Sequence, residues 1–312
     1  MAFQLKRGEP VPRAIRRIAA EQLDSSASQL RNAAPSERDE AVHEARKSIK
    51  KVRAILRLMA EELGPVAVAG NTLLRDLARR LSALRDAAVL VETVDSLKDQ
   101  LPADFNPALL AGIRKHLASD RDRIVQGLIA DHLPAAVAFA LERASERVRT
   151  WPLQTSGFAA LAPGLKRAFH RGRKDLKHVR RNPTMQGFHE WRKRVKDHWY
   201  LLRLLEGAWT EATRSYERGL KELETCLGDD HNLAVLRERI AASENAADLA
   251  SLLTVINARE KLLRNRALRL GQRLYAPKPR EYVRHAEASF NAWHAQRKSQ
   301  GNAKKTKASE AA

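Results

Sequence analysis

The chain has 312 residues, and its 57 lysines and arginines against 37 aspartates and glutamates give a formal net charge of +20. This excess is larger than a small acidic metabolite requires, and it points to nucleic acid, an anionic membrane or a phosphate polymer as partner. Aromatic residues are only 5% of the sequence, which counts against single-stranded nucleic acid bound through base stacking. The one cysteine, Cys226, excludes an intrachain disulfide and fits a reducing compartment.

Helical periodicity dominates, whereas the residue alternation of strands and the Asn-Gly or Asp-Gly signals of hairpins are nearly absent. In chain order, helices are predicted near residues 10–32, 37–62, 66–100, 107–130, 134–149, 162–181, 185–206, 209–241, 246–274 and 279–297. The segment 297–312 lacks apolar residues beyond alanine and is predicted to be a disordered basic tail. With no signal-peptide pattern and no run long enough to cross a bilayer, we expect a soluble, cytoplasmic protein without membrane contact.

One stretch occurs twice. The copies run from His43 to Met59 and from His189 to Leu205, and a second matching pair, 81–90 and 227–236, keeps the same offset of 189 − 43 = 146. A fixed offset over this distance predicts a duplicated structural unit. We therefore expect two halves, 1–150 and 151–296, each built on four main helices.

In both copies the cations gather on one side of the predicted helix and the apolar residues on the other. The cationic side holds His43, Arg46, Lys47, Lys50 and Arg57, with Arg53 at its edge, and in the second copy His189, Arg192, Lys193, Lys196 and Arg203. A solvated face would intersperse glutamate among these cations. The repetition of the cationic face in both copies favours a track for phosphate groups, although the position of Arg53 is occupied by Trp199 in the second copy.

Other helices show the same one-sided pattern. Arg167, Arg171 and Lys174 share one side of the helix near 162–181, and Arg13 and Arg17 begin a weaker version near the N-terminus. Packed by their apolar sides, such helices would line a shared basic groove or channel. If His43 and His189 bind phosphate, affinity is expected to rise as pH falls toward about 6.

Signals of enzymatic chemistry are mostly absent. His43-Glu44 and His189-Glu190 begin like the zinc-protease motif, but lysine stands where its second histidine is required. There is no Walker-type loop and no Gly-Xaa-Ser-Xaa-Gly elbow. Gly228-Asp229-Asp230-His231 is better interpreted as a helix break or capping turn than as a cation site. No catalytic residue, metal site or cofactor is predicted.

The two His-Xaa-Xaa-Arg-Lys-Xaa-Xaa-Lys segments, with the Leu-Xaa-Xaa-Leu-Arg-Asp-like segment downstream, resemble the CHAD domain, the conserved histidine α-helical domain. The likeness covers nearly everything from about residue 3 to 296, so residues 1–296 are expected to form one such domain. It implies an all-α fold of two four-helix-bundle subdomains related by a pseudo-two-fold axis around a basic central channel. It also implies binding of inorganic polyphosphate and association with polyphosphate granules.

The matching positions are His43, Arg46, Lys47 and Lys50, with His189, Arg192, Lys193 and Lys196; the other cations named above rest on the analysis of helix faces. No Glu-Xaa-Glu-Xaa-Lys signature of the CYTH triphosphatase domain, a frequent fusion partner of this family, occurs near the N-terminus, so a stand-alone binding module is expected. Two alternatives stay open: non-specific binding of nucleic acid, and an enzyme of polyphosphate or nucleotide metabolism. Neither the oligomeric state nor the preferred polymer length follows from the sequence.

Overall fold

The computed structural model describes residues 3–101, 105–130, 132–209, 211–241 and 249–309, and among these it leaves the side chains of residues 128–130, 212 and 296–309 undescribed. Its regular structure within these ranges is entirely helical, which confirms the predicted all-α class. The first half contains α1 (Val11–Asn32), α2 (Arg38–Leu58), α3 (Ala60–Leu63), α4 (Pro65–Arg80), α5 (Ser82–Leu97), α6 (Pro107–Ala130) and α7 (Leu133–Arg149). The second contains α8 (Ala162–Arg181), α9 (Met185–Leu204), α10 (Glu211–Ala241), α11 (Ala250–Leu274) and α12 (Pro279–Ser309).

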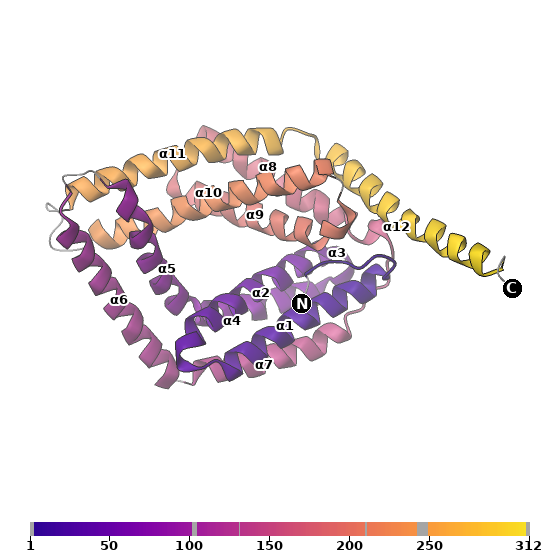
Figure 1. The fold of residues 1–312 in the computed structure, drawn as a ribbon, viewed down its shortest axis with the longest axis horizontal. Coiled ribbons are helices and arrows are strands. Elements are labelled where there is room, and N and C mark those ends of the chain that lie inside the picture. The colour runs from indigo at the N-terminus through magenta and orange to yellow at the C-terminus, as the bar shows by residue number, and fades with distance from the viewer. Residues whose placement is uncertain (1–2, 102–104, 131, 210, 242–248, 310–312) are drawn as a thin grey trace.

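The helices form two packed groups. Figure 1 shows α1, α2, α4 and α7 in one group and α8, α9, α10 and α11 in the other, with α5 and α6 reaching from the first toward the second. Where the groups meet, α2 packs against α9 and α8, and α5 packs against α10. At the opposite end from α5 and α6, α12 leaves the body of the molecule (Figure 1). The arrangement is compatible with an internal duplication.

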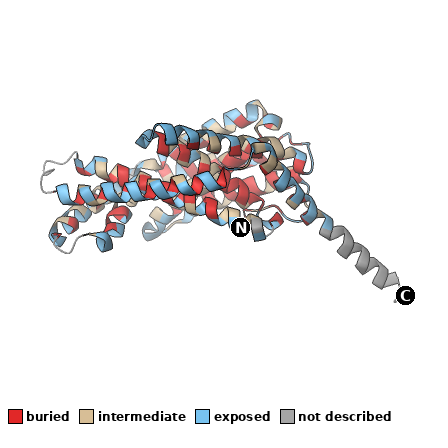
Figure 2. Cartoon of the chain, turned by 90° about the horizontal axis from the view of Figure 1, so that it is seen from above, coloured by how far each residue is buried: buried red, intermediate tan, exposed pale blue. Residues whose placement is uncertain are grey.

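Predicted apolar faces are buried. On α2 these are Ile49, Val52, Ile55 and Leu56, and on α9 Val195, Leu201 and Leu202. They belong to one large core cluster, and Figure 2 shows buried and exposed residues alternating along the helices as an amphipathic pattern requires. Because the apolar sides of α2 and α9 are buried in this core, the cationic sides of both helices must point away from it.

The helix predicted over 66–100 is two helices, α4 and α5, separated at Leu81. The break leaves the last carbonyls of α4 without intrahelical partners. Arg46 supplies one, since its Nη1 donates to the carbonyl oxygen of Ala78 at 2.5 Å. No glycine or proline marks this point in the sequence, so the break depends on a tertiary contact that local patterns do not contain.

The predicted break at 228–231 is wrong, because α10 runs through it without interruption. The polar side chains there have partners on other helices. Arg264 Nε donates to Asp230 Oδ1 at 2.6 Å, and His231 Nδ1 lies 3.1 Å from His189 Nδ1. Residues that would favour a cap in isolation are therefore accommodated within the helix.

Two packing details fix α8 and α9. Gly164 on α8 lies so close to α2 that a Cβ there would stand 2.1 Å from the carbonyl oxygen of Leu58, which only glycine avoids. On α9, His198 is fully buried, and its ring nitrogens lie 3.2 Å from the Tyr275 hydroxyl and 2.9 Å from the Tyr282 hydroxyl. Burial lowers the pKa of His198 to about 3, so this histidine is a neutral core residue.

The prediction of a disordered tail over 297–312 is not tested. Helix α12 has Ser309 as its last residue, but the side chains from residue 296 onward and residues 310–312 altogether lie outside what the structure describes. That part of the expected organisation stays a prediction.

Candidate polyanion-binding site

The two cationic helix faces meet where α2 crosses α9. Lys50 is the centre of this meeting: burial lowers its pKa to about 7, and the nearby positive charges of Lys196, Arg46 and Arg192 lower it further. Two of these neighbours come from the other half of the chain. We call Arg46, Lys50, Arg192 and Lys196 the crossing cluster; all four are positions predicted from the repeat.

The arginines of the crossing cluster have unused hydrogen-bonding capacity. The Nε atoms of Arg46 and Arg192 are both buried, and neither finds an acceptor among the described residues. Leaving a buried donor of a charged group unpaired costs on the order of 1–3 kcal/mol. These two Nε atoms occupy the same position in the repeat, so one such donor is unpaired in each copy.

The two lysines of the cluster differ in their anionic neighbours. Lys196 Nζ donates to Glu224 Oε1 at 2.6 Å, and Lys221 Nζ donates to Glu224 Oε2 at 2.8 Å. Glu224 is only 4% exposed. Burial alone would raise its pKa, but the two lysines outweigh this effect and hold it at about 2. By contrast, no hydrogen bond or ion pair of Lys50 occurs among the described residues.

Sequence reasoning missed Glu224. Its position in the repeat, 224 − 146 = 78, is occupied by Ala78 in the first half. Features common to the two copies of the repeat therefore do not include Glu224. Glu224 can be recognised as a partner of the cationic face of α9 only once α10, which carries it, is known to pack against α9.

The cationic faces of α2 and α9, which we call the two stripes, each contain a second lysine outside the crossing cluster. This lysine is paired within its own helix. Lys47 Nζ donates to Glu44 Oε1 at 2.8 Å, and Lys193 makes the equivalent ion pair with Glu190. Glu44 and Glu190 therefore lie at the edge of the cationic faces. Such exposed pairs contribute little stability and open readily for an anionic ligand.

Both stripe histidines are half-buried and disfavour the charged form. Burial and nearby cations, Arg85 for His43 and Lys193 for His189, lower their pKa values below the usual 6.5. His189 also contacts His231. Burial and the nearby charge of His189 lower the pKa of His231 to about 4. The first half has no such pair, since the counterpart of His231 is Arg85. Any gain in affinity from these histidines therefore shifts to a lower pH than the sequence predicted.

The C-terminal ends of the stripes are held differently. Arg57 Nη2 donates to Asp197 Oδ1 on α9 at 2.5 Å, whereas its counterpart Arg203 pairs with its helical neighbour Glu206 and lies over Trp199, 5.6 Å from the ring centroid. Asn71 on α4 accepts from both Arg53 and Arg57, at 3.0 and 3.1 Å.

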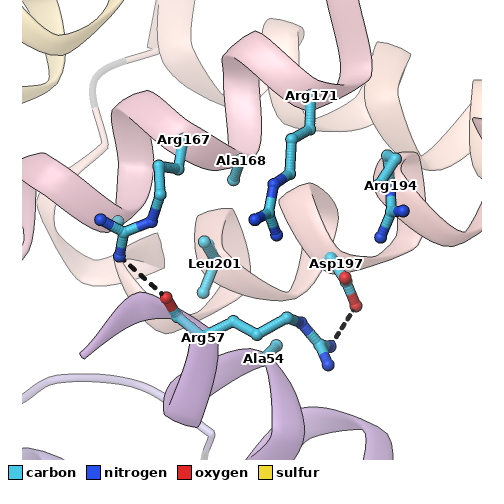
Figure 3. Close-up of a pocket in the computed structure, with 9 residues that line it drawn as sticks. Ala54, Arg57, Arg167, Ala168, Arg171, Arg194, Asp197 and Leu201 are labelled. Carbon is cyan, nitrogen blue, oxygen red and sulfur yellow. Dashed lines mark hydrogen bonds and ion pairs between the residues drawn. The ribbon is translucent and has the colours of Figure 1, made fainter. Parts of the chain in front are cut away.

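A pocket rich in arginine adjoins the crossing. Figure 3 shows Arg57, Arg167, Arg171 and Arg194 around it, with Asp197 the only carboxylate among its lining residues. Arg167 Nη2 donates to the carbonyl oxygen of Arg57 at 3.2 Å, which joins α8 to the end of α2. The enclosed volume of 20 Å³ has room for about one water molecule, so a phosphate group would enter only if these side chains moved.

The remaining predicted cations lie apart from the crossing cluster. Arg167 and Arg171 also border an open hollow of 1110 Å³ between α8 and the start of α12, together with Lys166, His170, Lys278 and Arg280. Lys174 and Arg13 are exposed. Arg17 is already paired with Glu9 at 2.7 Å and Glu21 at 3.2 Å. A role for these residues in the same site stays a prediction.

Among the described residues there is no group of three or more His, Cys, Asp or Glu side chains placed to hold a metal ion. Within the same part of the chain, no helix is both long and apolar enough to cross a membrane. The chemistry of the crossing is that of closely spaced cationic donors, which suits binding of oxygen-rich anions.

Comparison with known proteins identifies the family of this chain. The family model for the CHAD domain matches residues 14–241, so the chain belongs to the CHAD domain family. The chain has no significant match among curated proteins. Among solved structures, it is similar to the crystal structure of the CHAD domain from the plant Ricinus communis, with 19% identity, 92% of this chain and 95% of that chain covered, and a TM-score of 0.56. This likeness concerns the fold.

Proposed function

We propose that the protein binds inorganic polyphosphate at the crossing cluster, with cations from both halves contacting one polymer. The observation that supports this most directly is the close approach of four cations from two helices around Lys50, with orphaned guanidinium donors in both copies. Such an arrangement is unfavourable in the free protein and favourable once a polyanion neutralises it. Membership of the CHAD family, some of whose members bind polyphosphate, supports the same conclusion.

A phosphate polymer fits the site better than a nucleic acid does. Two helices bring their cations to one narrow crossing, and a polyphosphate chain has a charge on every unit without bulky bases between the helices. Of the aromatic rings beside the stripes, Trp199 is buried and already lies under Lys221, 4.5 Å from its ring centroid, so it offers no free stacking face. We propose a non-enzymatic binding module, located in the cytoplasm on polyphosphate granules.

The proposal is tested by titrating long-chain polyphosphate into the protein by calorimetry. Lys50→Glu reverses the central charge and is expected to weaken binding by about 100-fold, equivalent to about 2.7 kcal/mol. Lys115→Glu, the same change on the exposed face of α6, is the matched control and should alter affinity less than threefold. Equal losses in both variants would reject the crossing as the site.

Competition distinguishes the alternatives. Polyphosphate should displace a DNA or RNA oligonucleotide at matched charge, and the reverse should fail. Tighter binding of the nucleic acid would favour the nucleic-acid alternative. Release of orthophosphate during incubation with polyphosphate and a divalent metal would favour an enzyme.

A further inference from the structure

In the second half, Glu224 occupies the place at Lys196 that a phosphate group would take. Its two carboxylate oxygens lie between two ammonium groups, 2.6 Å from Lys196 and 2.8 Å from Lys221. Charge-assisted hydrogen bonds of this length are strong, and those of Glu224 are largely shielded from water. The arrangement resembles one phosphate unit held by two lysines.

In the first half no carboxylate occupies the position equivalent to Glu224, although the exposed Asp86 on α5 lies 3.8 Å from Arg46 Nη2. Ala78 stands at the counterpart position of Glu224, and its carbonyl oxygen accepts from Arg46. The positive charges of Lys196, Arg46 and Arg192 each lower the pKa of Lys50, and the negative charge of Glu224 raises it by less than any of them lowers it. An incoming phosphate meets no competitor at Lys50, whereas at Lys196 it must displace one.

We infer that Glu224 is a built-in competitor that holds Lys196 in the free protein and limits the affinity of the crossing cluster for polyphosphate. This inference rests on the proposed function. Polyphosphate binds at Lys50 and Arg46, while Lys196 stays bound to Glu224 in most wild-type complexes and contacts the polymer only where Glu224 is displaced. The carboxylate thus keeps the free protein folded against the repulsion of its cations, at the cost of affinity.

Glu224→Gln tests the inference, because it removes the charge and keeps the size of the side chain. Glu222→Gln is the matched control: it removes the same charge two residues away, from a partly exposed carboxylate that binds Arg266 at 2.6 Å. In calorimetric titrations with long-chain polyphosphate, Glu224→Gln should raise affinity about tenfold and the control less than threefold. The salt dependence of log K should steepen by about 0.7 only in Glu224→Gln, because Lys196 then neutralises one more phosphate.

A second readout is thermal. Free Glu224→Gln should melt below the wild type, since Lys196 loses its buried partner, but saturating polyphosphate should raise its melting temperature by more than that of the wild type. If Glu224→Gln does not fold, Glu224→Asp replaces it: the shorter side chain keeps the charge but reaches Lys196 less well, and affinity should rise about threefold.

The outcomes separate the two claims. A wild-type protein that does not bind polyphosphate overturns the proposed function. A wild type that binds, with Glu224→Gln no tighter than Glu222→Gln and an unchanged salt slope, overturns the inference alone. If Glu224→Asp is the variant used, an affinity no higher than that of the wild type has the same meaning.

Discussion

Lys50 and Lys196 occupy the same position in the two copies of the repeat, yet their surroundings differ. Burial lowers the pKa of both lysines, but Lys196 donates to Glu224, whereas Lys50 lies among cations and its pKa falls to about 7. The stripes resemble each other in sequence, so the difference arises from what α4, α5 and α10 place against them. In the free protein Lys196 therefore has a buried carboxylate partner, and Lys50 has none among the described residues.

Neutral substitutions at these two lysines should have opposite effects on stability. Lys196→Met leaves Glu224 buried with one partner and should lower the free energy of unfolding by about 2 kcal/mol. Lys50→Met removes an uncompensated charge and should raise it by about 1 kcal/mol. Chemical denaturation at pH 6, where both lysines are charged, measures the two values. Losses of similar size would show that the halves are equivalent and would break the comparison.

The pH dependence of binding should follow Lys50. In the free protein this lysine loses its proton as pH rises through about 7, and a bound polyanion restores its pKa toward 10.5. Affinity should therefore increase by about tenfold as pH falls from 9 to 7. Lys50→Met should flatten that part of the profile, while Lys115→Met should leave it unchanged. A flat wild-type profile would contradict the assignment.

The same shift makes a prediction for the free protein. Because the folded pKa of Lys50 lies below its unfolded value, the unfolded chain binds more protons between pH 7 and 10.5, and stability gained from this group rises with pH in that window. The destabilisation is fully present below pH 7. Comparing denaturation of the wild type and Lys50→Met at pH 6 and pH 9 isolates this contribution, and the difference between the two proteins should be larger at pH 6.

The ends of the stripes should differ by a smaller amount. Arg57→Ala removes the contact to Asp197 between the halves and should cost about 1–2 kcal/mol, because Asp197 loses its partner. Arg203→Ala removes an exposed pair with Glu206 and should cost less than about 0.5 kcal/mol. Denaturation midpoints of the two variants give the comparison directly. Equal losses of stability in the two variants would mean that the contact between Arg57 and Asp197 does not stabilise the packing of the halves.

Much of this organisation can be predicted from the sequence. Apolar residues at helical spacing place Ile49 and Val195 in the core, and this burial directs Lys50 and Lys196 toward each other. The repeat therefore predicts the members of the crossing cluster. These features depend on periodicity, which each helix carries within its own residues.

The remainder depends on contacts between distant segments. The break at Leu81, the continuous α10 and the pairing of Glu224 with Lys196 are each decided by a partner on another helix. Comparing the repeats directs attention to what they share, and Glu224 is a difference between them. The contact between Arg57 and Asp197 likewise depends on how α2 and α9 pack, which neither helix contains in its own residues.

The proposed site depends most directly on Lys50 being a half-buried lysine among cations from both halves. Carbon-13 NMR of selectively labelled lysine, with Lys50→Arg to assign the signal, measures its pKa in the free and polyphosphate-bound protein. We expect a pKa near 7 in the free protein and a rise of more than one unit upon saturation with polyphosphate. A free-state pKa near 10.5 that does not change with the polymer would contradict it.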